Sequence, residues 1–170
     1  PTPPRATPAT PAQAAALAAH YNGVLTGYQL LRRRMVWLAG CCVSELAPHM
    51  HAPLYGALVK LLPSQRSAVE PDEAEILLRL TTVNSLSAMV LDWGFTVEAF
   101  EPHAGAAVEG LYAVFAKAEE DDSKLQVLTL LKEIVNRLED RAILCRSLVR
   151  PLVTPLGPLW RELTNHRTLH

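Results

Sequence analysis

The residues best suited to hold a metal ion are His49 and His51, which follow the adjacent pair Cys41 and Cys42. Histidines two positions apart do not share one face of a helix, so they cannot both reach one ion from a helix. The two cysteines lie within an apolar stripe, where a reduced thiol behaves as a small hydrophobic group. We therefore expect no metal site.

The sequence also offers little that could support catalysis. Cys145 could act as a nucleophile only if a histidine activated it, and no local pattern pairs it with one of the six histidines. Gly105 and Gly110 match no phosphate-binding loop. The three cysteines show no C-x-x-C spacing, which favours a reducing compartment. We expect a protein that is not an enzyme and that uses no cofactor.

A run of four acidic residues, 119–122, is the strongest candidate for a binding site. Two interpretations stay open. The acids can complement the dipole at the start of the next helix, where each is worth roughly 0.3–1 kcal/mol. Alternatively, they form an acidic contact for a basic protein partner, extended by three glutamates that precede them. The candidate partner-binding set is Glu98, Glu101, Glu109, Glu119, Glu120, Asp121 and Asp122.

The charge distribution limits the kinds of partner. The net charge is −1, but residues 67–122 hold twelve acidic and two basic side chains, and the flanking segments are both basic. Nucleic-acid binding needs a concentrated positive surface, which this acidic centre does not provide. An acidic face can serve a basic partner or only keep the protein soluble. The longest apolar run, 35–43, is too short to cross a bilayer, so we expect no membrane insertion.

Three helical hairpins follow one another at a spacing of about 45 residues, over 28–62, 75–118 and 123–163. Apolar residues recur at three- and four-residue steps, as on one face of a helix. No segment shows the alternation typical of a strand. A period of this length is typical of HEAT and armadillo solenoids, whose units stack to bury their apolar faces. The predicted fold is all-α, an α-α superhelix of about three hairpins.

Several local signals set the expected boundaries. Residues 1–12 read as a Pro/Ala/Thr-rich disordered linker or loop insertion, and 13–170 as the solenoid. A short helix at 13–19 should close at Asn22-Gly23, and the first hairpin helix should span 28–46. Ser123 and Gln126 are spaced as a capping box. Pro155 and Pro158 should kink or split a last helix over 148–163.

The apolar stripe of the first hairpin helix is predicted to be core between neighbouring repeats. It comprises Leu31, Met35, Leu38, Cys42 and Leu46. A basic residue recurs at similar places in the three hairpins, which we interpret as a ladder between repeats. Its members would be Arg32 to Arg34, Arg79 and Lys124.

Between residues 31 and 160 the chain resembles the importin-beta nuclear transport receptors, and among them the importin-eleven type. The resemblance rests on the order and separation of several strings, none of them diagnostic alone. The strings are Leu31-Arg32-Arg33-Arg34-Met35-Val36, Leu77-Leu78-Arg79-Leu80-Thr81-Thr82, Phe100-Glu101-Pro102, the helix 124–138 and Pro158-Leu159-Trp160. The chain begins at Pro1, and residues 164–170 look like the start of a further repeat, so we expect a central segment of a longer protein.

The resemblance implies a receptor that shuttles between nucleus and cytoplasm. Such a receptor binds a cargo protein, contacts nuclear pore proteins and is regulated by the GTP form of Ran, here mainly through repeats outside this segment. It also implies that the second helices, near 51–62, 101–118 and 148–163, face cargo or Ran. The alternative is a HEAT scaffold subunit of a complex outside transport.

Overall fold

The structure is a computed structural model that describes residues 11–63 and 72–158, with the side chains described from residue 20 onward. These residues form seven α-helices joined by three short 3-10 helices. No strand occurs within the described ranges. The prediction of an all-α helical-repeat solenoid is confirmed.

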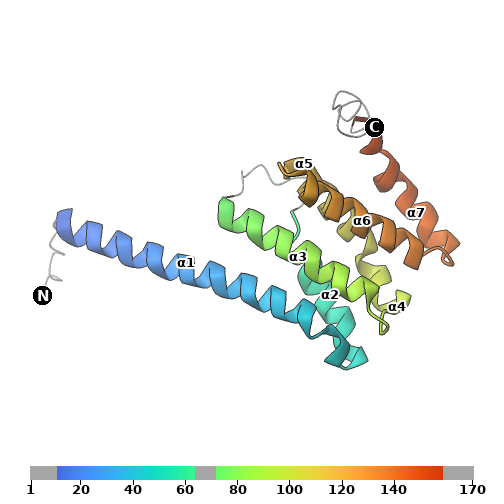
Figure 1. Cartoon of the computed structure of the whole chain (residues 1–170), viewed down its shortest axis with the longest axis horizontal. Coiled ribbons are helices and arrows are strands. Elements are labelled where there is room, and N and C mark those ends of the chain that lie inside the picture. Colours follow the sequence, from blue (N-terminus) through green and yellow to red (C-terminus); the bar gives the residue numbers. More distant parts are fainter. Residues whose placement is uncertain (1–10, 64–71, 159–170) are drawn as a thin grey trace, which may run out of the picture.

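The helices lie in two layers. The first layer holds α1 (Pro11–Cys41), α3 (Glu73–Leu91) and α6 (Asp121–Arg137), which run side by side in the same direction (Figure 1). The second layer holds α2 (His51–Val59), α5 (Ala104–Lys117) and α7 (Ala142–Val153). A short helix α4 (Val97–Phe100) leads into the second layer. Each first-layer helix is thus followed by a second-layer helix, as expected of stacked hairpins.

The core lies between the two layers and is continuous along the stack. Its largest fully buried side chains come from the second and third hairpins and from α2. Tyr55 stands edge-on to Phe100, with ring centroids 5.1 Å apart, which is a favoured arrangement for aromatic pairs. Apolar residues at three- and four-residue spacing therefore specify the fold, as the sequence indicated.

The first helix is longer than predicted. The expected break at Asn22-Gly23 does not occur, because α1 is continuous for 31 residues. No described glycine has a positive φ, and the Thr26 hydroxyl donates to the Asn22 carbonyl at 2.9 Å, within the helix. An Asn-Gly pair is therefore not sufficient by itself to end this helix.

The ends of the first hairpin also differ from the prediction. Instead of continuing to residue 46, α1 ends at Cys41 and two 3-10 turns follow, Val43–Glu45 and Pro48–Met50. Proline opens the second of these turns, since its missing N–H costs nothing in a first turn. The second helix begins at His51, as predicted.

The third hairpin corrects two further predictions. The N-cap of α6 is Glu120, not Ser123, so the expected capping box is absent. The Ser123 hydroxyl instead donates to the Glu120 carboxylate at 3.5 Å. Helix α7 begins at Ala142, earlier than the predicted 148, and ends at Val153; a turn at 154–155 separates it from helical residues 156–158, so the predicted split at Pro155 is observed. Residues 159–170, and with them the expected further repeat, lie outside the described residues.

By length and composition, α3 is apolar enough to cross a membrane, although the longest apolar run in the sequence is elsewhere and short. In this structure α3 lies between α1 and α6 and packs on the second layer. Of the apolar stretch of α3, 39% is buried inside the structure. The helix also carries Arg79, which is paired with Glu75. The central position of α3 in the stack accounts for its composition.

Candidate functional site

The acidic run connects the second and third hairpins. Glu119 and Glu120 lie in the connection after α5, and Asp121 and Asp122 occupy the first turn of α6. All four side chains are exposed. The two aspartates stand where the helix dipole favours negative charge, which agrees with the first of the two interpretations. Their position does not exclude a second role in binding.

Beside this run the described residues line a hollow of about 250 Å³. Its floor is apolar and comes from the first half of α3 and the end of α5. Its rim is charged, with Glu119 and Glu120 on one side. The lining residues are Ile76, Leu77, Arg79, Leu80, Val114, Lys117, Ala118, Glu119, Glu120 and Ser123. An apolar floor with a charged rim suits a long side chain that ends in a cation, because such side chains bury their stems and keep the charge at the edge.

Arg79, on the rim of this hollow, pairs within its own helix. Its Nε lies 3.3 Å from Glu75 Oε1, one turn earlier. Arg33 of α1 donates to the Thr81 hydroxyl at 3.3 Å and makes no ion pair within the described ranges. Salt bridges therefore do not form the predicted basic ladder between repeats in the described part of the chain. Arg79 contacts its own helix, whereas Arg33 reaches the next hairpin through the Thr81 hydroxyl.

The other three candidate glutamates lie away from the run. Glu98 on α4 pairs with Arg141 before α7, so this acid joins the second and third hairpins. Glu101 lies at the start of the α5 segment and Glu109 in its middle, both exposed. Because α5 has 14 residues, about 21 Å of helix separates Glu101 from Glu119. The structure therefore splits the predicted set into two groups.

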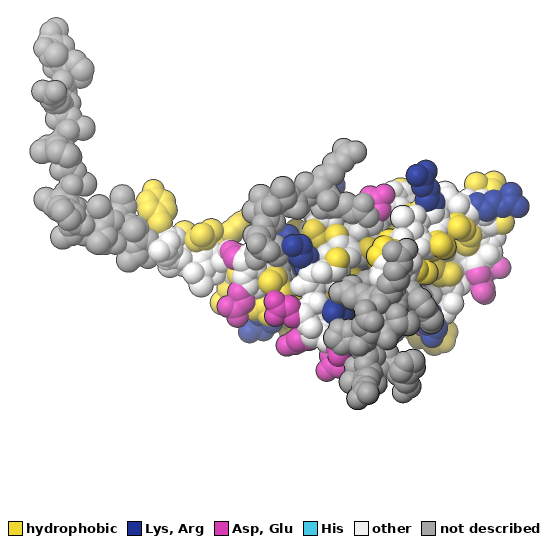
Figure 2. Space-filling view, turned by 90° about the horizontal axis from the view of Figure 1, so that it is seen from above, with side chains coloured by type: hydrophobic (Ala, Val, Ile, Leu, Met, Phe, Trp, Pro, Cys, Tyr) yellow, Lys and Arg dark blue, Asp and Glu magenta, His cyan; other side chains and the backbone are white. Residues whose placement is uncertain are grey.

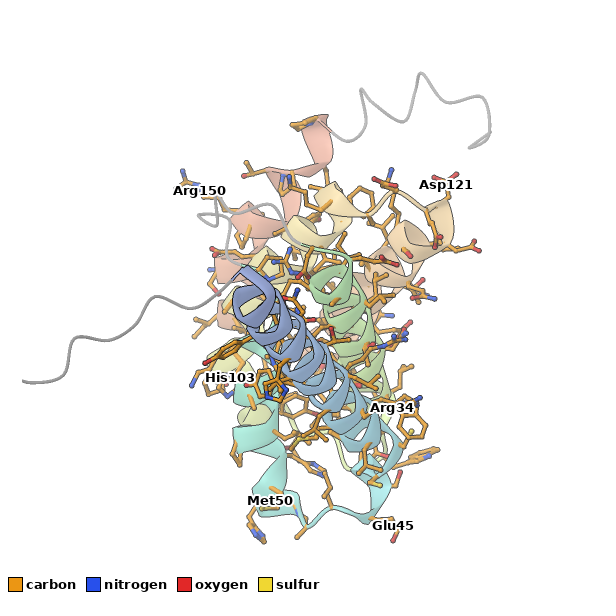
Figure 3. All side chains as sticks on the ribbon, turned by 90° about the vertical axis from the view of Figure 1, so that its left-hand side faces the viewer. Arg34, Glu45, Met50, His103, Asp121 and Arg150 are labelled. Atoms are coloured by element: carbon orange, nitrogen blue, oxygen red, sulfur yellow. The ribbon has the colours of Figure 1, made fainter. Side chains whose placement is uncertain are left out.

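Figures 2 and 3 agree with this division. Acidic side chains form separate groups on the face in Figure 2, not one patch. In Figure 3, Asp121 lies on the side of the first layer, whereas His103 and Arg150 lie on the side of the second layer. The second layer also carries the exposed arginines of α7, Arg141, Arg146 and Arg150. Its surface is mixed in charge, so the acidic run is the better candidate for a basic partner.

A polar cluster at the opposite end of the hairpins was not predicted from the sequence. Asp92, after α3, accepts hydrogen bonds from the Ser44 hydroxyl at 2.6 Å and from the Gly94 backbone N–H at 2.7 Å. These hydrogen bonds hold the pKa of the Asp92 carboxyl below its usual value. Ser44 belongs to the first hairpin, so this contact ties the first hairpin to the second.

The third hairpin joins the same cluster through Arg137. Its guanidinium donates to the Leu91 carbonyl at 3.1 Å and lies over the Phe95 ring, 5.6 Å from the centroid. Tyr55 donates to the Met89 carbonyl at 3.2 Å, and its burial raises its pKa to about 12. These residues lie in separate parts of the sequence and form no common motif. We call the set Ser44, Tyr55, Asp92, Phe95 and Arg137 the turn cluster.

His51 is 4% exposed, and its Nε2 has no hydrogen-bond partner within the described structure. It lies against Gly94, where an added Cβ would come within 3.1 Å of the imidazole. Among the described residues, no three His, Cys, Asp or Glu side chains are grouped to hold a metal ion. Cys41 is exposed and Cys42 half-buried, and both are free. His51 is therefore best understood as part of the packing beside the turn cluster.

Two layers of stacked helices and a polar cluster that joins three hairpins define a helical-repeat protein. The chain is similar to Importin-11 of Mus musculus and to Importin-11 of Homo sapiens. It is 28% identical to each over 143 residues, which cover 84% of this chain and 13% of each relative. The resemblance to importin-eleven-type receptors is confirmed over that span.

The chain therefore spans about an eighth of the length of the curated relatives that it matches. No protein-family model matches it, and no solved structure matches it. The comparison supports a segment of the importin type. It leaves cargo, Ran and the whole protein's activity to be inferred.

Proposed function

We propose that this chain is part of a nuclear transport receptor that shuttles between nucleus and cytoplasm, binds a cargo protein and nuclear pore proteins, and releases its cargo under control of Ran-GTP. The observation that carries the proposal is the similarity to Importin-11 along 84% of a chain that folds as stacked hairpins. The protein works by reversible binding without catalysis or cofactor. Stacked repeats suit this role, because they offer long surfaces to macromolecules.

The natural gene product that contains this chain is the material for the main test. Its affinity for Ran loaded with GTP is compared with its affinity for Ran loaded with GDP. We expect at least tenfold tighter binding of the GTP form, which equals about 1.4 kcal/mol. Equal or absent binding would contradict the transport function and favour the alternative, a HEAT scaffold subunit of another complex.

Within this segment, we propose the hollow beside Glu119 and Glu120 as a contact for a basic stretch of cargo. The support is its apolar floor, the two glutamates on one side of a rim that also carries Arg79 and Lys117, and the excess of acidic side chains in residues 67–122. Rim charges act mainly on association rate and on salt dependence. Binding to this hollow should therefore weaken steeply as ionic strength rises.

A charge reversal tests the acidic contact directly. The double variant Glu119→Lys/Glu120→Lys is compared with Glu139→Lys/Asp140→Lys, which makes the same charge change in the exposed turn before α7. The probe is a fluorescent lysine-rich peptide, titrated at low and at physiological salt. We expect at least a fivefold loss of affinity in the first variant and less than a twofold loss in the second. Equal losses in both variants would show that only net charge matters and would remove the hollow as a site.

A further inference from the structure

One face of α1 carries apolar side chains that the structure leaves bare. They follow alternating steps of three and four residues, so they form one straight stripe along the helix. Each is between 53% and 66% exposed. The stripe comprises Tyr21, Val24, Tyr28, Leu31, Met35 and Leu38. Leu31, Met35 and Leu38 were predicted to be core between repeats, and in this structure they are exposed.

The stripe is bare because α1 uses its other side to pack on α3. On that side Gln29 donates to Asp72 and the Ser85 hydroxyl donates to the Val36 carbonyl at 2.8 Å. Gly40 allows this close approach, since an added Cβ would lie 2.9 Å from the Ser85 Cα. Figure 2 shows the uncovered apolar side chains along the part of α1 that extends beyond the stack.

The stacking of the hairpins shows what fits this stripe. Helices α1 and α3 end at Cys41 and Leu91, so equivalent positions in the two helices differ by 50 residues. Leu31 and Met35 therefore correspond to Thr81 and Ser85 of α3. Those two α3 residues contact α1. Thr81 accepts a hydrogen bond from Arg33, and Ser85 donates one to the Val36 carbonyl. The stripe on α1 thus occupies the face that, on α3, is covered by the preceding hairpin.

The second layer extends the same face. An apolar groove of about 490 Å³ runs from Met35, Leu38 and Cys42 of the first hairpin across to Met50 and Leu54 at α2. A face that uses both layers is matched by a helical hairpin better than by a single helix. Its position continues the α1–α3 and α2–α5 interfaces by one more step along the stack.

The charges beside the stripe argue against a second copy of this chain. Arg32 and Arg34 flank it on its two sides, and Arg32 lies over the Tyr28 ring, 5.8 Å from its centroid. Two copies joined along the stripe would bring these arginines together, and like charges beside an apolar seam disfavour pairing. A hairpin with acidic residues at the matching positions would be favoured.

We propose that the stripe and groove form a repeat-stacking interface, covered by a further helical hairpin of the same polypeptide that precedes α1. The chain spans only 13% of the relatives it resembles, so a longer polypeptide is consistent with them. This inference does not depend on transport, because a receptor and a scaffold would both need the interface.

The three methionines of the chain provide a test without mutation. Met35 and Met50 lie on the proposed interface, 63% and 46% exposed, whereas Met89 is 0% exposed and serves as an internal control. Oxidation by dilute peroxide follows access to the sulfur and is read by mass spectrometry. In the natural gene product, Met35 and Met50 should oxidise at least ten times more slowly than in the 170-residue chain. Met89 should stay slow in both.

A pair of variants provides a second measurement. Met35→Glu should leave the melting temperature of the 170-residue chain within about 1 °C, since the site is exposed there, but lower that of the natural product by several degrees. The control is Leu30→Glu, a similarly exposed position off the stripe, which should change neither protein.

Three results would overturn the proposal. Equal methionine oxidation in the two proteins would show that no hairpin covers the interface. Protection that grows with the concentration of the 170-residue chain would identify a second copy as the occupant. Protection of the natural product that disappears when other polypeptides are removed in high salt would identify a separate partner.

Discussion

The contact between the first and second hairpins in the second layer can be tested at Gly110. This glycine lies inside α5 and is buried against Leu62, in the turn after α2. A Cβ placed on it would come within 2.6 Å of the Leu62 Cβ, which is more than 1 Å closer than an ordinary carbon contact. The clash involves the root of the Leu62 side chain, so a rotamer change cannot relieve it. Gly110→Ala must therefore push α5 away from the turn at Leu62 that follows α2.

The expected change in the free energy of unfolding of Gly110→Ala is the difference between two opposing effects. Overpacking of a tight interior costs roughly 1–3 kcal/mol. Replacing a glycine inside a helix by alanine stabilises the folded protein by roughly 0.5–1 kcal/mol, because the unfolded chain has less conformational freedom. The net destabilisation is about 1–2 kcal/mol, and at this chain length each kcal/mol lowers the melting temperature by roughly 2–4 °C.

The control for this prediction is Gly105→Ala in the same helix. Its added Cβ would meet nothing within 4 Å, so only the favourable term applies and the variant should be neutral or slightly stabilised. Urea unfolding followed by circular dichroism gives both free energies of unfolding. If Gly110→Ala were as stable as Gly105→Ala, the close packing of Leu62 on α5 would be refuted.

Two further predictions concern the turn cluster. Asp92 has a lowered pKa in the folded state, so its contribution to stability is present above its unfolded pKa near 4 and is lost as the pH falls through the lower folded value. Asp92→Asn should therefore make stability less dependent on pH between about 5 and 3, and an unchanged acid transition would contradict the Ser44 contact. Tyr55 has a pKa raised to about 12, so its contribution is complete below pH 10 and is lost as the pH rises toward 12. Tyr55→Phe should flatten that alkaline loss and cost about 0.5–1.5 kcal/mol at neutral pH, since the hydrogen bond to the Met89 carbonyl is removed. Alkaline unfolding that is the same in both proteins would contradict the burial of this hydroxyl.

The sequence predicted the core faces of the second and third hairpins well, because burial decides them, but it was wrong about Leu31, Met35 and Leu38, which are exposed. Val83, Leu86 and Val90 are at most 1% exposed, as their spacing on one helix face indicated. The sequence predicted the helix boundaries less well, because several residues near each boundary favour different end points. Asn22-Gly23 remained helical within α1, and Ser123 lost the cap position to Glu120. Such residues mark where a helix can end, but packing of the neighbouring turns decides where it does.

The candidate site was predicted only in part, for a related reason. The acids at 119–122 are adjacent in sequence, so their grouping was visible, whereas the distance from Glu101 along α5 needed the fold. The turn cluster could not be found from spacing. Ser44, Asp92 and Arg137 lie in three different hairpins, and only the stacking of these hairpins brings them together.

The two polar regions lie at opposite ends of the first-layer helices, and this arrangement bears on how the segment could respond to a partner. Arg137 ties the end of α6 to the Leu91 carbonyl at the end of α3. The hollow instead borders the beginnings of the same two helices, at Ile76 and Ser123. A partner that inserts into the hollow therefore acts on the helix ends farthest from this tie.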